Sequence, residues 1–133
     1  MEHFRGPADR HYLRKVTQRT LARERNTVIV PGVDVTADVA AINEGLGQTA
    51  SGGYLINGRT YGIHGQSLYP ISGPGFIQLD RPAFQALGVY NKFGNTEQAA
   101  RIIDAMAQTN PGLTPDQRLA ALQSWQIGQG VIP

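Results

Sequence analysis

Residues 53–64 read Gly-Tyr-Leu-Ile-Asn-Gly-Arg-Thr-Tyr-Gly-Ile-His. Two short apolar and aromatic runs flank Asn57-Gly58, and this dipeptide is typical of a type I′ turn, because both central positions of that turn take positive φ. We therefore predict a β-hairpin in which residues 54, 55 and 56 lie opposite residues 61, 60 and 59. Further short apolar runs, separated by turn residues, extend to Leu79. The hairpin is thus predicted to continue as an antiparallel β-meander over residues 53–79.

Alternation along the hairpin divides its side chains between two faces, because successive residues of a strand point to opposite sides. One face is predicted to pack on the core, and its members are Tyr54, Ile56, Tyr61 and Ile63. His64 falls on the opposite face, which we expect to be partly open to solvent.

Helices are predicted on both sides of the meander from capping residues and from apolar residues at helical spacing. Thr114-Pro115-Asp116-Gln117 is a capping box with proline in the first turn. Thr27–Val30 is β-branched and indicates one more short strand. The predicted fold class is α+β, in a single domain over residues 1–133, with a small antiparallel meander covered by several helices. The predicted helices span residues 9–25, 36–44, 82–87, 96–107 and 115–126.

The composition excludes several classes of protein. The chain contains no cysteine, which excludes disulfides and thiolate metal sites and agrees with a reducing cytoplasm. Nothing in it approaches the roughly 20 apolar residues of a membrane span, and it begins with charged residues rather than a signal peptide. With three scattered histidines and none of the common nucleotide or zinc motifs, we expect no metal and no cofactor. The expected location is cytoplasmic.

Charge is distributed unevenly along the chain. The first 25 residues contain seven basic and three acidic side chains, a net charge of +4, whereas the remainder carries a net charge of −2. In the predicted helix over residues 9–25, a narrow apolar stripe leaves a broad cationic face formed by Arg10, Arg14, Lys15, Arg19 and Arg23. This face is interpreted as a contact for RNA, DNA or an acidic partner protein, as a solvated helix surface, or as a surface for a homo-oligomer.

One group of residues on the meander has the side chains that acid/base chemistry needs. Metal-independent cleavage of RNA uses the 2′-hydroxyl as an internal nucleophile, and the protein supplies a base, an acid and positive charge. The predicted roles are His64 as general acid/base, Arg59 or Arg81 as phosphate binder, and Tyr61 or Tyr69 as auxiliary. The hairpin register places Arg59 and His64 on different faces. The alternative is that His64 is only a turn histidine and the tyrosines pack at the edge of the core.

Four stretches together resemble a domain that occurs in uncharacterised bacterial proteins, some of them polymorphic-toxin-like and some carried on mobile elements. The stretches are Asn57–His64, Leu68–Gly75, Leu79–Arg81 and Ala86–Thr96, and the resemblance covers about residues 40 to 107. It implies a toxin-like effector, without an assigned reaction or catalytic residues. Because the chain begins with its own Met1, we expect a free-standing relative rather than a cleaved toxin tip.

Two functional hypotheses follow from these observations. In the first, the protein is a toxin-like effector that cleaves RNA, with the basic helix and Arg81 as the RNA-binding surface. In the second, it is a non-catalytic module that uses the basic helix to bind nucleic acid or an acidic protein.

Overall fold

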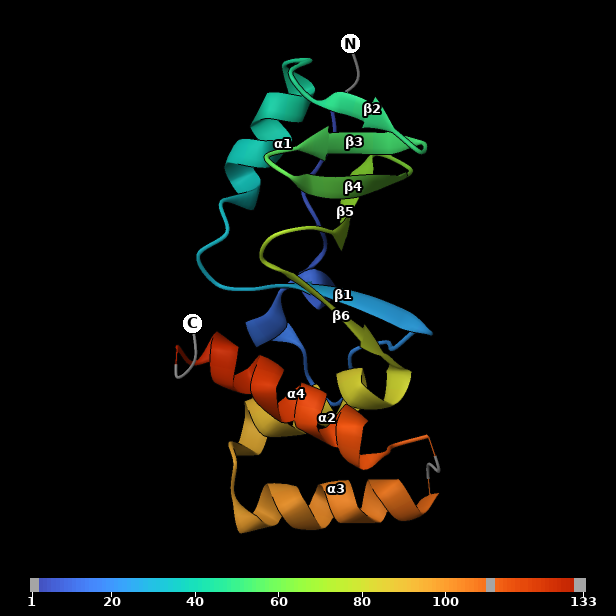
Figure 1. The fold of residues 1–133 in the computed structure, drawn as a ribbon, viewed down its shortest axis with the longest axis vertical. Coiled ribbons are helices and arrows are strands. Elements are labelled where there is room, and N and C mark those ends of the chain that lie inside the picture. The colour runs from blue at the N-terminus through green and yellow to red at the C-terminus, as the bar shows by residue number, and fades with distance from the viewer. Residues whose placement is uncertain (1–2, 110–111, 131–133) are drawn as a thin grey trace.

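The computed structural model describes residues 3–109 and 112–130. It confirms the α+β class and the β-meander. Figure 1 shows an elongated molecule with the sheet of β2, β3, β4 and β5 and helix α1 at one end, helices α2, α3 and α4 at the other, and strands β1 and β6 between them. The strands are β1 (Arg25–Ile29), β2 (Gln48–Ala50), β3 (Gly53–Ile56), β4 (Arg59–His64), β5 (Ser67–Ser72) and β6 (Phe76–Asp80). The helices are α1 (Val35–Asn43), α2 (Arg81–Phe93), α3 (Glu97–Thr109) and α4 (Pro115–Gly128).

The four-stranded sheet has the order β2-β3-β4-β5 and contains the predicted hairpin. Tyr54 lies opposite Tyr61 and Ile56 opposite Arg59, as predicted. The turn residues Asn57 and Gly58 have φ values of 54° and 77°, which are the positive values that a type I′ turn requires. Strand β2 is not among the predicted elements, because its residues 48–50 show no apolar alternation.

The prediction that the meander extends to Leu79 is wrong. Strand β6 leaves the four-stranded sheet and pairs antiparallel with β1, so that Val28 lies opposite Ile77 and Ile29 opposite Phe76. Residues on one face of this two-stranded sheet pack on the helices, and residues on the other face pack on α1 and the meander. The sheet therefore separates two hydrophobic cores and is buried on both faces.

The prediction of a helix over residues 9–25 is also wrong. Two short 3₁₀ turns, Asp9–His11 and Leu13–Lys15, are followed by irregular chain as far as β1. Side chains elsewhere satisfy the backbone here in place of helical hydrogen bonds: Asn91 Nδ2 donates to the carbonyl oxygens of Leu13, at 2.8 Å, and Val16, at 2.9 Å. The side-chain hydroxyl of Thr20 accepts from the Thr17 amide, a local bond that competes with a helix.

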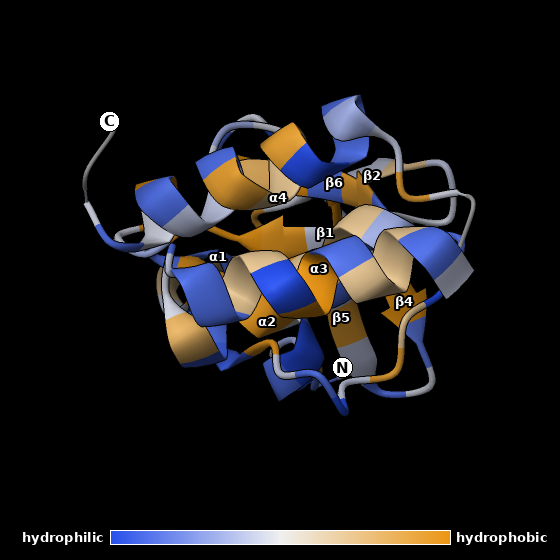
Figure 2. Ribbon diagram, turned by 90° about the horizontal axis from the view of Figure 1, so that it is seen from below, coloured by the Kyte–Doolittle hydropathy of each residue, from blue (hydrophilic) through white to orange (hydrophobic). Residues whose placement is uncertain are grey.

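Helix α2 continues to Phe93, so the prediction that it ends near Gly88 is wrong. A Cβ atom at position 88 would lie 2.6 Å from the carbonyl oxygen of Thr17. Gly88 is therefore a contact residue that lets the N-terminal segment approach the helix, and it does not end the helix. The other predicted helices are confirmed with small changes at their ends, and the capping box of Thr114 and Gln117 forms with both of its hydrogen bonds. Figure 2 shows polar and apolar residues alternating along α3. Its apolar residues pack in the hydrophobic core that the helices share.

A buried carboxylate joins α1 to the hairpin. Asp38 is 1% exposed and accepts hydrogen bonds from Arg59 Nε at 2.6 Å, Arg59 Nη2 at 3.0 Å, the Tyr61 hydroxyl at 2.5 Å and Asn57 Nδ2 at 2.7 Å. Burial by itself raises the pKa of Asp38, but the hydrogen bonds from Arg59, Tyr61 and Asn57 outweigh it and lower that pKa. Burial and the neighbouring carboxylate raise the pKa of Tyr61.

Replacing Asp38 by alanine should destabilise the protein by about 3 kcal/mol or more, because Arg59 would stay largely buried without its counter-charge. Urea unfolding measures this change. Asp104→Ala, which removes an exposed carboxylate paired with Arg118, should cost at most about 1 kcal/mol and serves as the control. Equal losses in the two variants would contradict the role given to Asp38.

The stabilisation from Asp38 should depend on pH in a defined direction. Its pKa is lower in the folded protein than in the unfolded chain, where it is about 3.9, so the ionised carboxylate favours folding. The difference in unfolding free energy between the wild type and Asp38→Asn should be constant above about pH 5 and should shrink as the pH falls below about 4. Urea unfolding at several pH values, from above about 5 to well below about 4, measures this difference, and a difference that grows in acid would contradict the assignment.

Candidate nucleic-acid interface

Among the predicted catalytic residues, the structure brings Arg59 and Tyr61 together, but around a structural carboxylate. Both Arg59 and Tyr61 bind Asp38, and the Tyr61 side chain is buried completely. The Arg59 side chain is 15% exposed. These contacts hold α1 on the sheet and leave Arg59 with little surface for a substrate.

His64 lies apart from these two residues, at the exposed end of β4. A strand rises about 3.3 Å per residue, which separates His64 from Tyr61 by roughly 10 Å along the strand, and the two residues are on opposite faces. Ile63, which the alternation placed in the core, is 36% exposed, because β4 extends past the edge of the core at this point. Arg81 is exposed at the first position of α2, in the helical half of the molecule.

The face of the sheet that carries His64 also carries Tyr69. Strand pairing sets His64 opposite Ser67 and Gly62 opposite Tyr69, and directly opposed residues share a face. The Tyr69 ring lies over Gly62, since a Cβ atom there would be 2.3 Å from Tyr69 Cζ. The ring of His11 stacks beside Tyr69, with centroids 6.4 Å apart and planes inclined by 25°. This face therefore presents an aromatic pair that the sequence did not indicate.

The surroundings of His11 indicate which ring nitrogen carries the proton and in which direction its pKa is shifted. Its Nδ1 atom lies 3.1 Å from the carbonyl oxygen of Thr27, and because a carbonyl oxygen only accepts, Nδ1 carries the proton and Nε2 is an acceptor. Burial lowers the pKa of His11, the Thr27 hydrogen bond opposes this, and the charges of Arg10 and Arg23 lower it further. His11 is accordingly a neutral ring at pH 7, with two arginines nearby.

Asn26 positions these two arginines. Its Oδ1 atom accepts from Arg10 Nη2 at 3.0 Å and from the Arg23 amide at 2.8 Å, and its Nδ2 atom donates to the Arg23 carbonyl oxygen at 2.9 Å. Arg10 Nε is buried and has no hydrogen-bond partner among the residues that the structure describes. Sequence spacing alone does not reveal this cluster, because β1 and the N-terminal segment meet only in the folded chain.

A second group of cations lines a groove between the N-terminal segment and α2. The cavity has a volume of about 480 Å³, and its charged lining residues are Arg14, Arg19 and Lys92. The described residues that line it include no acidic side chain, and none of these three cations takes part in an ion pair there. Gly88 and Asn91 hold the segment against the helix at this place. The groove is therefore a site of concentrated positive charge.

The remaining predicted cation is different in its contacts. Lys15 forms an exposed ion pair with Asp9 at 3.2 Å and lies over the Tyr12 ring. Lys92 is not among the predicted binding residues, because no sequence pattern links a residue of α2 to a segment more than 70 positions earlier. The structure thus joins two of the predicted binding residues, Arg14 and Arg19, to one that only the fold supplies.

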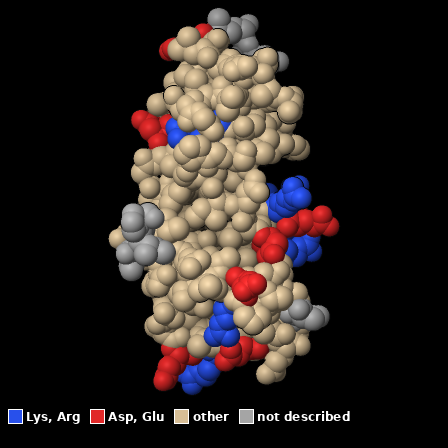
Figure 3. Space-filling view, in the orientation of Figure 1, with Lys and Arg blue, Asp and Glu red and all other residues tan. Residues whose placement is uncertain are grey.

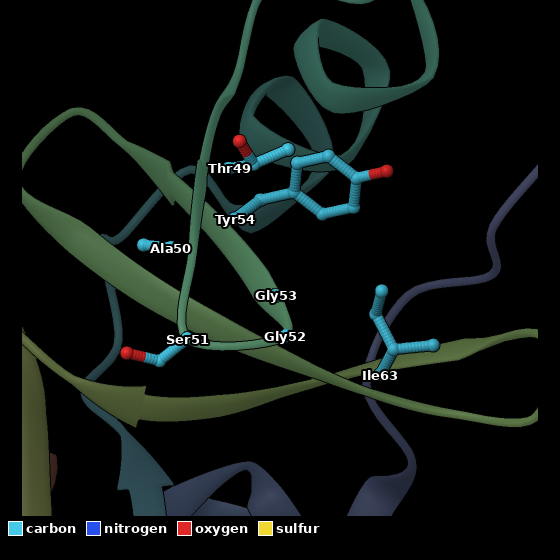
Figure 4. Close-up of a pocket in the computed structure, with 7 residues that line it drawn as sticks. All are labelled: Thr49, Ala50, Ser51, Gly52, Gly53, Tyr54 and Ile63. Carbon is cyan, nitrogen blue, oxygen red and sulfur yellow. The ribbon is translucent and has the colours of Figure 1, made fainter.

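Two other surfaces are weaker candidates. A cavity of about 460 Å³ lies beside the turn between β2 and β3. Residues 49–54 and Ile63 line it, and none of them is charged (Figure 4). Figure 3 shows one face of the molecule, on which acidic and basic side chains lie intermixed around a broad uncharged middle. Neither surface has the excess of one sign of charge that the groove has.

Within the described ranges, no helix has both the length and the apolar character needed to cross a membrane. The same residues contain no group of three histidine, aspartate or glutamate side chains placed to hold a metal ion.

Comparison with known proteins gave no match: no family model, no curated protein and no solved structure matches this chain. The resemblance to a domain of mobile-element and toxin-like proteins accordingly stays a prediction that depends on the stretches quoted above.

Proposed function

We propose that this domain binds nucleic acid by holding its phosphate backbone in the basic groove. The observation that carries the proposal is the lining of the groove, where Arg14, Arg19 and Lys92 meet without an acidic side chain among the described lining residues. Arginine and lysine are the side chains that proteins use for phosphate contacts.

The charges of the groove are available to a ligand. Cations that already have carboxylate partners within a protein contribute less to an external anion, and these three have no such partner among the described residues. The excess of positive charge in the first 25 residues adds a field that attracts a polyanion. A nucleic acid offers phosphates in a continuous row, so that one strand contacts several of these cations together.

The test uses a fluorescein-labelled single-stranded RNA of twelve nucleotides and measures its binding by fluorescence anisotropy. Arg19→Glu should weaken binding roughly tenfold or more, because it removes a positive charge from the groove and adds a repulsive negative one. The slope of log affinity against log salt concentration should also become less steep, by about 0.7 for each phosphate that the protein no longer neutralises.

Arg101→Glu is the matched control for this test, because Arg101 is an exposed arginine on α3 without an ion pair among the described residues and the change in net charge is identical. This variant should bind nearly as tightly as the wild type. No binding by the wild type at 50 mM salt, or equal losses in the two variants, would contradict the proposal. Binding to an acidic polypeptide in place of RNA would assign the groove to a protein partner.

Cleavage of bound RNA, in a toxin-like effector, is the second candidate function. It is favoured by the strand register, which puts His64 on the same open face as Tyr69. In this proposal His64 takes the proton of the 2′-hydroxyl or gives one to the leaving 5′-oxygen, and the hydroxyl oxygen attacks the adjacent phosphate. His64 is exposed and has no side-chain hydrogen bond in the described part of the chain, so it is accessible to such a substrate.

Inducible expression in bacteria tests the second function. The wild type should arrest growth and degrade total RNA on a gel, and His64→Ala should do neither while remaining folded. His3→Ala is the control, since His3 is also exposed and lies outside the sheet. Intact RNA and normal growth with the wild type would rule out cleavage, and an unchanged effect in His64→Ala would rule out this histidine.

A further inference from the structure

We propose that Tyr69 and His11 form a stacking site for nucleobases, so that the ligand of this domain is a single-stranded nucleic acid. This inference rests on the proposed nucleic-acid binding. The groove would bind the phosphates of the ligand, and the aromatic pair would bind its bases. Proteins that bind single strands without strong sequence preference combine a positively charged groove with aromatic rings on which bases stack.

Tyr69 differs in its surroundings from the tyrosines that pack in the two cores. It is 37% exposed, on the open face of the sheet. By contrast, Tyr61 is bound to Asp38, Tyr54 packs edge-on against Phe4, and Tyr90 packs beside Trp125. One side of the Tyr69 ring rests on the backbone of Gly62, which has no side chain to displace it. The strand thus supports a flat aromatic ring that keeps a large exposed area.

His11 extends this aromatic surface with a ring that is held in one orientation. Its ring lies beside Tyr69 at a small angle, and the hydrogen bond from Nδ1 to the Thr27 carbonyl oxygen fixes its orientation. Burial, with a further contribution from Arg10 and Arg23, keeps its pKa below the ordinary value, so the ring is neutral at pH 7. A rigid neutral ring loses little conformational freedom when a base stacks on it.

Positively charged side chains lie close to the aromatic pair. Arg10 and Arg23 are close enough to His11 to affect its pKa, and Arg14 of the groove follows His11 by three residues. Three residues of chain span at most about 11 Å, so the aromatic pair and the groove lie within reach of one short strand. A base stacked on Tyr69 therefore leaves its neighbouring phosphates near these cations.

The position of these groups favours a single strand over a duplex. In a duplex the faces of the bases are covered by their neighbours in the stack, and only unpaired bases can be splayed onto an aromatic side chain. The phosphates of a duplex still reach the groove, so the duplex should bind through charge alone. Selectivity for the single strand would come from the aromatic pair.

The experiment compares two labelled twelve-unit strands, oligo(dT) and an abasic strand of the same length that has sugar and phosphate but no bases. Tyr69→Ile replaces the ring over Gly62 with an apolar side chain that also favours strands, and so removes the aromatic face. It should weaken binding of oligo(dT) roughly 5- to 100-fold and leave the abasic strand nearly unchanged. Tyr69→Phe retains the ring and should bind both strands like the wild type.

A second variant keeps the test valid if Tyr69→Ile is poorly folded, which urea unfolding will reveal. His11→Asn retains a side-chain donor for the Thr27 carbonyl oxygen but lacks the ring, and it should show the same selective weakening on oligo(dT). If folded variants bind oligo(dT) as tightly as the wild type, or bind both strands equally less tightly, the stacking site is overturned while phosphate binding stands. If the wild type binds neither strand, the proposed function itself fails.

Discussion

The two-stranded sheet of β1 and β6 is apolar on both faces, so both faces must be buried. The helices cover one face, and α1 with the meander covers the other. Val28 and Ile77 face the helical core, and their neighbours Ile29 and Phe76 face the core under α1 and the meander. A sheet of only two strands cannot protect two apolar faces in water, so each face needs a separate layer. Figure 1 shows those layers at the two ends of the elongated molecule.

Helix α1 and the four-stranded sheet cover one face of β1 and β6, and a buried carboxylate holds these two elements together. Asp38 has Arg59, Tyr61 and Asn57 as partners, and their hydrogen bonds offset the cost of burying its carboxylate. This contact fixes which face of the hairpin points inward. Because Tyr61 and Arg59 face α1, the alternation of the strand turns Gly62 and His64 outward, and Tyr69 lies with them. The aromatic face thus follows from the buried ion pair.

The basic N-terminal segment shows why helical spacing can mislead. Its apolar residues do recur at helical intervals, and Leu13 and Val16 are indeed buried. The backbone nevertheless obtains its hydrogen bonds from Asn91 and Asn26, and Gly88 lets it lie directly on α2. In this irregular form Arg14 and Arg19 meet Lys92, whereas a helix would have spread the cations around its circumference. Tertiary contacts of this kind override local propensity, and they are invisible in a single sequence.

By itself the sequence determined the features that depend on neighbours in the chain. These are the Asn57-Gly58 hairpin with its register, the capping box at Thr114, the α+β class and the excess of positive charge at the N-terminus. Turns and caps are local, because their hydrogen bonds close within a few residues. The tertiary structure alone determined that β6 pairs with β1, that His11 lies beside Tyr69, and that Lys92 completes the groove. Each of these contacts joins segments that are far apart in the chain. The free energy that stabilises them comes from burying the two hydrophobic cores, and no short stretch of sequence contains all the residues of either core.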